Sequence, residues 1–255
     1  PNAGEASLHP HNPDQRQRHV LIASWSGKLD PEKFESSLLK KLLKGSFKGD
    51  SDASEKELFI QELIGVTALG NATKLLKPKA IIFIGPNPPN GKSQFLDLCR
   101  GVLPSEAICS IPLGKLSDEK YLAELSGKYL NAADELTSAS SIASDIFKQV
   151  VTGESITARS AYKHPVTFQP EALHIFATNV LPSFKGGMDG GVQRRLTVLS
   201  FNRTIPENER TEHIGTLIIE READLLLDFA VEGACRVVRQ RYFTEPASSK
   251  EALHE

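Results

Sequence analysis

The sequence predicts an α/β protein built around a largely parallel β-sheet. Short apolar runs recur between residues 80 and 201, and none of them alternates regularly between polar and apolar positions. Such runs are typical of strands that are buried on both faces, as the strands of a parallel sheet are. Helical patterns separate several of the runs, as the connections between parallel strands require. The expected strands are residues 80–84, 107–111, 128–133, 173–178 and 196–201.

Composition places the chain among soluble globular proteins. Its 255 residues are 40% hydrophobic and 24% charged, and the formal net charge is only −2, so a basic nucleic-acid surface would have to be local. No apolar run approaches the roughly 20 residues that span a bilayer, so we expect no membrane partner. The polar N-terminal residues do not have the pattern of a signal peptide, and the three cysteines show neither metal-site nor disulfide spacing. Both observations predict a cytoplasmic protein.

Helical patterns flank the expected sheet on both sides. Residues 31–43 carry leucines at helical spacing, and a second helix is expected to begin at a capping box formed by Ser54 and Glu57. Two further helices are expected at 207–220 and 221–241. The predicted organisation is a flexible segment (1–18), an N-terminal helical region (19–72), a core (73–204) and C-terminal helices (205–255).

The expected first strand runs directly into the sequence GPNPPNGKSQFL, residues 85–96. A strand, a Gly-rich turn and a helix in this order make a phosphate-binding loop, because backbone N–H groups at the helix N-terminus face the anion. Lys92 is then expected to reach the β- and γ-phosphates, and the Ser93 hydroxyl to ligate Mg²⁺. The alternative is a chance Gly-Lys-Ser at a turn. The expected nucleotide-binding residues are Gly85, Asn90, Gly91, Lys92, Ser93 and Gln94.

Two acids, Asp134 and Glu135, end the expected strand at 128–133. Following a phosphate-binding loop, they suit the second half of a nucleotide site. Asp134 is expected to hold Mg²⁺, and Glu135 to polarise the water that attacks the γ-phosphate. The alternative is a pair of solvated acids at a strand end.

Polar residues also border the last two expected strands, one after the strand at 173–178 and two before the strand at 196–201. Asn179 ends the strand at 173–178, at the sheet edge where ligands of α/β proteins bind, although an Asn in a turn is a serious alternative. Arg194 and Arg195 follow a Gly-rich loop, where an arginine could stabilise the transition state on a neighbouring subunit's ATP. A plain surface arginine pair explains them equally well.

Two extended runs, 156–159 and 166–169, flank the sequence SAYKHP. They predict a β-hairpin with a basic and aromatic tip. Lys163 suits a phosphate contact, and Tyr162 or His164 suits stacking on a sugar or base. From these residues alone, an ordinary exposed hairpin is favoured.

Together these motifs resemble the superfamily 3 helicases, specifically the motor domains of phage and plasmid primase-helicases related to poxvirus replication NTPases. The resemblance covers about residues 57–201. Its most specific parts are FKQVVTGESITARSAYKHPVTFQPEALHIFATNVLP, at 147–182, and GGVQRRLTVLSF, at 190–201, together with Asn-Gly-Lys-Ser at 90–93.

The resemblance implies a modified AAA+ core with strand order 5-1-4-3-2 and a small helical collar made from the terminal segments. It implies a ring, usually of six subunits, that uses ATP and Mg²⁺ to translocate on single-stranded DNA, normally 3′ to 5′. Asn179 becomes a sensor, one arginine of 194–195 the finger acting in trans (Arg194 is favoured), and Lys163-His164 the DNA-contacting tip. One departure is the phosphate loop, which has five residues between Gly85 and Gly91 where four are usual. Any primase domain is expected upstream of Pro1.

Three functions remain open at this point. The leading one is a replicative DNA helicase of a phage, prophage or plasmid. The second is an ATP-dependent initiator or remodeller that grips or melts DNA without processive unwinding. The third is a nucleotide-gated assembly protein that does not act on DNA.

Overall fold

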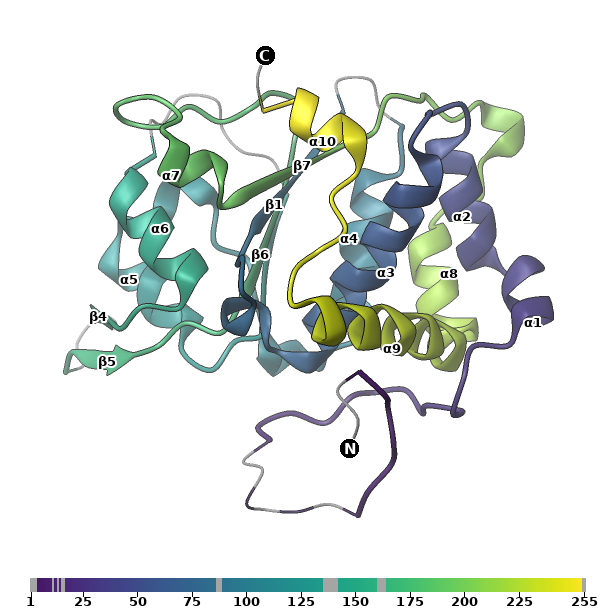
Figure 1. The fold of residues 1–255 in the computed structure, drawn as a ribbon, viewed down its shortest axis with the longest axis horizontal. Coiled ribbons are helices and arrows are strands. Elements are labelled where there is room, and N and C mark those ends of the chain that lie inside the picture. The colour runs from purple at the N-terminus through teal and green to yellow at the C-terminus, as the bar shows by residue number, and fades with distance from the viewer. Residues whose placement is uncertain are drawn as a thin grey trace.

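The structure is a computed structural model that describes residues 4–10, 12, 14, 17–85, 89–134, 142–159 and 164–253. A parallel sheet stands between two groups of helices (Figure 1). Its strands are β1 (Ala80–Ile84), β2 (Ile108–Cys109), β3 (Leu130–Ala133), β6 (Leu173–Thr178) and β7 (Leu196–Ser200). The helices are α1 (Pro31–Glu35), α2 (Leu38–Phe47), α3 (Ala53–Leu69), α4 (Lys92–Gly101), α5 (Glu119–Leu122), α6 (Ser144–Thr152), α7 (Gly190–Gln193), α8 (Ile214–Arg221), α9 (Ala223–Gln240) and α10 (Ala247–Glu251).

The strand order is β2-β3-β6-β1-β7, and every neighbouring pair is parallel. When the five strands are numbered along the chain, this order reads 5-1-4-3-2 from the β7 edge, so the predicted order is confirmed. Each expected run contains a strand, although the run at 107–111 forms only two residues of ladder. The predicted hairpin is also present, with β4 (Ile156–Ala158) antiparallel to β5 (Val166–Phe168).

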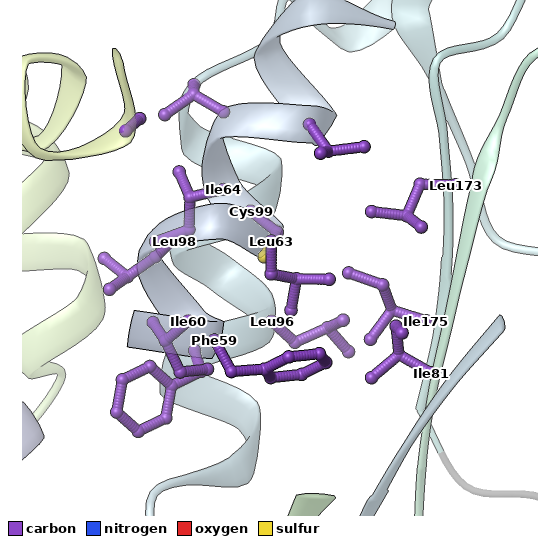
Figure 2. Packing of buried hydrophobic residues seen from close by; sticks show 14 of the residues in the cluster. Phe59, Ile60, Leu63, Ile64, Ile81, Leu96, Leu98, Cys99, Leu173 and Ile175 are labelled. Atoms are coloured by element: carbon purple, nitrogen blue, oxygen red, sulfur yellow. The ribbon is translucent and has the colours of Figure 1, made fainter. Parts of the chain in front are cut away.

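Both faces of the sheet are buried, which explains why its strands do not alternate in polarity. In β1, Ile81 and Phe83 belong to one apolar cluster, whereas Ala80 and Ile82 belong to another. The first cluster lies under α2, α3, α4, α8 and α9. Figure 2 shows part of it, where Phe59 and Leu63 of α3 approach Ile175 of β6. The second cluster lies under α5, α6, α7 and the hairpin.

The first predicted helix is interrupted. Instead of one helix over 31–43, α1 ends at Glu35 and α2 begins at Leu38. The reason is a second N-cap: the Ser37 hydroxyl accepts a hydrogen bond from the backbone N–H of Lys40, at 3.0 Å. The Glu222 carboxylate accepts from the N–H groups of Leu38 and Leu39, at 2.9 and 3.1 Å, which satisfies two more donors at this helix start.

The predicted capping box at Ser54 and Glu57 is wrong. Helix α3 begins two residues earlier than a Ser54 N-cap implies, at Ala53, with Asp52 in the N-cap position. Ser54 therefore lies inside the first turn, and the Glu57 carboxylate instead contacts the Lys40 ammonium of α2, at 2.6 Å. The helix expected at 207–220 is also shorter: a 3₁₀ turn, η6 (Glu207–Glu209), precedes α8.

The N- and C-terminal helices pack against each other through α3 and α9, and α3 also lies against the sheet. The two helices meet at glycines. A Cβ on Gly65 would lie 2.5 Å from the backbone nitrogen of Ala234, and one on Gly233 would clash with the backbone of Gln61. No helix within the described ranges is long and apolar enough to cross a membrane. The domain boundaries stay predictions.

The close approach of α3 and α9 predicts that Gly65→Ala destabilises the protein by about 1–3 kcal/mol, as overpacking typically does. Gly45→Ala in α2 is the matched control, because a Cβ there would meet nothing within 4 Å. It should stabilise the protein by about 0.5–1 kcal/mol, the usual cost of a helical glycine relative to alanine. Urea unfolding measures both. Equal effects of the two changes would contradict the backbone contact.

Candidate nucleotide-binding site

The loop between β1 and α4 is where the sequence predicts a phosphate-binding loop. Residues 86–88 lie outside the described part, and the flanking residues define the two ends of the loop. Gly91 is the N-cap of α4 and has a φ of 92°. Residues other than glycine rarely adopt this backbone conformation. A Cβ on Gly91 would also lie 2.5 Å from the Ser46 hydroxyl of α2. Both observations require a glycine at this position.

Asn90 ties the two ends of this loop together. Its side-chain nitrogen donates to the Gly85 carbonyl at 3.1 Å, and its side-chain oxygen accepts from the backbone N–H of Lys92 at 3.4 Å. The side chain is buried, with 3% of the residue exposed. Asn90 therefore has a loop-shaping role that the sequence pattern alone does not reveal.

Lys92 lies at the centre of the site. Its ammonium donates to the Gly85 carbonyl, to the Thr178 carbonyl at 3.0 Å and to the Asn179 side-chain oxygen at 2.7 Å. The residue is only 8% exposed, and it forms no ion pair with any described residue. Burial lowers the pKa of Lys92 below its ordinary value. A buried cation with only neutral partners is suited to binding an anion.

The next two residues of α4 point in different directions. Ser93 is exposed, and its hydroxyl has no hydrogen-bond partner in the part of the chain that is described, so it is available to a ligand. The Gln94 side-chain oxygen accepts from the backbone N–H of Gly215 at 2.8 Å. In this structure Gln94 thus serves as the hydrogen-bond acceptor for a backbone N–H group in the first turn of α8.

The carboxylate of Asp134 lies just beyond β3, one strand away from β6. One of its oxygens, Oδ2, is 3.2 Å from the guanidinium of Arg100 in α4. The same guanidinium contacts Asp97 at 3.2 Å and the Ala132 carbonyl at 3.0 Å. Glu135, the predicted partner of Asp134, lies outside the described residues.

Arg100 is the site residue that the sequence reasoning missed. The available signal was its place on α4, eight residues after Lys92 and three after Asp97. Two turns of helix carry it from the phosphate loop to β3, the strand that precedes Asp134. The spacing alone cannot show that the side chain turns toward this strand.

Asn179 follows β6 and contacts Lys92, so the structure brings the predicted sensor and the predicted phosphate-binding lysine together. The turn that holds Asn179 is fixed by Thr178. The Thr178 hydroxyl donates to the Val180 carbonyl at 2.8 Å and lies 3.2 Å from the Val180 backbone N–H. Asn179 therefore does not simply end a strand in a turn, because its side chain accepts a hydrogen bond from Lys92, 87 positions away in the sequence.

The two arginines at 194–195 differ in their surroundings. Arg195 donates to the Gly191 carbonyl at 2.9 Å, and its side chain is partly buried. Arg194 is exposed and forms no hydrogen bond or ion pair through its side chain with the described residues. Neither arginine contacts Lys92 within the chain.

The β4–β5 hairpin lies on the α5–α6 side of the sheet (Figure 1). The hydroxyls of Thr157 and Thr167 face each other across it, 2.8 Å apart. At its tip His164 is exposed, whereas Tyr162 and Lys163 lie outside the described residues.

The chemistry of the site suits a nucleotide with Mg²⁺. Among the described residues, no group of three or more His, Cys, Asp or Glu side chains is arranged to hold a metal ion. Mg²⁺ bound with a nucleotide needs no such group, since phosphates and waters supply most of its ligands and the protein adds one or two oxygens. The Ser93 hydroxyl and the free Asp134 oxygen would be those ligands, and Lys92 would meet the phosphates.

Comparison with known proteins adds three findings. Residues 83–195 match the model of a protein family described as a family of unknown function (DUF5906). A curated protein of Acanthamoeba polyphaga mimivirus, named as a "Putative helicase", is 29% identical over 132 residues. That match covers 48% of this chain and 14% of the mimivirus protein. The family match contains every residue that the sequence predicts for the site.

Solved structures of the C-terminal region of NrS-1 have a similar fold. Three of them give TM-scores of 0.61, 0.58 and 0.62, with sequence identities of 19%, 20% and 19%. In each case 91% of this chain aligns with 52% of the other, so this chain spans about half of that region. At these identities the likeness concerns the fold.

Burial of the Lys92 ammonium predicts a specific pH dependence of stability. Because its pKa is lowered in the folded protein, the unfolded chain binds more protons between that lowered pKa and the ordinary value near 10.4. In that window the free energy of unfolding contributed by Lys92 rises with pH. The stability of the wild type relative to Lys92→Met should therefore increase as the pH rises toward the ordinary lysine pKa near 10.4, as measured by urea unfolding.

The control for the loss of one positive charge is Lys120→Met, which removes an exposed lysine of α5. Parallel pH curves for wild type and Lys92→Met would show that the ammonium is not desolvated in the folded protein.

Proposed function

We propose that this chain is the ATP-hydrolysing motor of a DNA helicase, from a replication protein of a phage, prophage or plasmid. The observation that carries the proposal is the buried Lys92 ammonium, which has no carboxylate partner among the described residues and lies at the N-terminus of α4 and the carboxyl edge of a parallel sheet. The helix N-terminus and the lysine both favour an anion at this place. The triphosphate of ATP supplies the missing negative charge.

The remaining site residues take roles that fit the geometry. Ser93 and Asp134 hold Mg²⁺, and Asn179 orients the attacking water while it senses the γ-phosphate through its contact with Lys92. Glu135, next to Asp134 in the sequence, polarises that water. Mg²⁺ held by these residues would supply positive charge against the charge that develops on the phosphate oxygens during transfer.

Assembly into a ring, usually of six copies, completes the site in this proposal. Arg194 is exposed and has no side-chain partner within the described chain, as a residue reserved for a neighbouring subunit's nucleotide would be. The hairpin tip with Tyr162, Lys163 and His164 contacts single-stranded DNA, and translocation runs 3′ to 5′. For the helicase activity itself, the proposal is supported by the helicase name of the mimivirus relative and by the fold shared with NrS-1.

The proposal predicts that Mg²⁺-ATP stabilises the protein by about 2.7 kcal/mol at a concentration near 100 times Kd. Lys92→Ala should abolish this stabilisation and lower ATPase kcat/KM by about 10²–10³-fold, the usual effect of removing one preorganised electrostatic donor. Thermal unfolding and phosphate release measure the two effects. Lys120→Ala is the control and should match wild type. Unchanged hydrolysis by Lys92→Ala would exclude this loop as the phosphate site.

Action on DNA is tested separately from hydrolysis. Single-stranded DNA should stimulate the ATPase, and the assembled ring should displace a DNA strand. The double variant Lys163→Ala, His164→Ala should lose DNA binding, because the tip loses its charged and stacking contacts. Native mass spectrometry with an ATP analogue and Mg²⁺ gives the number of copies. DNA binding without strand displacement would favour an initiator or remodeller, and a verified ring that hydrolyses ATP without binding DNA would favour an assembly protein.

A further inference from the structure

Arg100 joins the two halves of the site, although no motif marks it. It lies in the last turn of α4, the helix that begins at Lys92, and its guanidinium reaches both β3 and Asp134, the residue that follows β3. We propose that Arg100 is a positioning residue of the nucleotide site, which orients the Asp134 carboxylate for Mg²⁺ and thereby sets the affinity for Mg²⁺-nucleotide. This inference rests on the proposed function.

The guanidinium is fixed independently of Asp134. One nitrogen, Nη2, donates to the Ala132 carbonyl at 3.0 Å, within β3, and Nη1 donates to the Asp97 carboxylate of α4 at 3.2 Å. The side chain is held from the strand and from its own helix, and it is 27% exposed. A group anchored on both sides can hold a third partner in one orientation.

That third partner is the Asp134 carboxylate. Nη2 contacts its Oδ2 at 3.2 Å, while the other oxygen, Oδ1, has no hydrogen bond to the described residues. The Asp134 side chain is 46% exposed, so without Arg100 it would be free to rotate in solvent. Arg100 thus engages one oxygen and leaves the other for a metal ion. Carboxylates that bind metals are commonly oriented in this way by a hydrogen-bonded neighbour.

Charge gives a second reason for an arginine here. Asp97 and Asp134 bring two carboxylates to one guanidinium. Without the cation, the two acids would repel each other and the triphosphate. The planar, forked donor set of arginine binds the carbonyl and both acids at once, whereas a lysine presents a single point charge. Arg100→Lys should therefore restore the charge and only part of the orientation.

The test measures binding of a fluorescent ATP analogue to the full chain, once with MgCl₂ and once with EDTA. Arg100→Ala should weaken binding by about 10–100-fold with Mg²⁺, the usual effect of losing a residue that orients a metal ligand. Binding in EDTA should be unchanged. Arg100→Lys should give an intermediate loss, and it serves as the test variant if Arg100→Ala does not fold. Arg221→Ala, which removes an exposed arginine from the last turn of α8, is the matched control.

A double-mutant cycle separates positioning from general damage. Asp134→Asn should lose the same Mg²⁺-dependent affinity, and the double variant Arg100→Ala, Asp134→Asn should lose no more than either single change, because the two residues act as one unit. Additive losses would overturn the inference. So would equal losses by Arg100→Ala in Mg²⁺ and in EDTA, or no loss in either.

The wild type distinguishes this inference from the proposed function. If it binds the analogue equally well with and without Mg²⁺, the role of Arg100 is overturned and nucleotide binding stands. If it binds no nucleotide under either condition, both proposals are overturned.

Discussion

The pairing of β1 with β6 is the interaction on which the site depends. The register sets Ile84 opposite Thr178, so the residues that follow, Gly85 and Asn179, leave the sheet side by side. These positions are almost a hundred residues apart in the sequence, and Lys92 contacts both of them. A shift of one residue in this register would exchange the two faces of β6 and separate the lysine from the asparagine. The pairing of strands in the core therefore brings the candidate site residues together at the carboxyl edge of the sheet.

Two buried lysines differ in how their positive charge is balanced, and this difference distinguishes a structural lysine from one suited to binding a ligand. Lys56 is fully buried, and its ammonium is matched by Asp50 at 2.7 Å, by Asp52 at 3.4 Å and by the Ser200 carbonyl at 3.0 Å. Lys92 is nearly as buried, but among the described residues its ammonium contacts only carbonyl and amide oxygens. The first lysine is neutralised within the fold, whereas no described residue balances the charge of the second. Natural proteins rarely keep such a charge without a use for it.

The sequence predicted the sheet well because buried parallel strands have a plain signature. All five runs contain strands, and the hairpin lies where the turn pattern placed it. The strand order followed from the resemblance, not from the residues themselves. Local competition explains the failures: Ser37 starts a second helix that apolar spacing does not reveal, and Asp52 takes the N-cap position expected for Ser54. Arg100 was missed because its role depends on a tertiary contact with β3.

The hairpin and the lysine lie at opposite ends of one strand. The segment 169–172 connects β5 directly to β6, and β6 ends one residue before Asn179. Six residues of strand span about 20 Å, and ladders with β1 and β3 hold β6 on both sides. A central strand of this kind is a rigid element, because it can neither stretch nor slide without breaking the hydrogen bonds of its ladders with β1 and β3. The segment 169–172 is therefore the first stretch between Asn179 and the hairpin that lies outside these ladders.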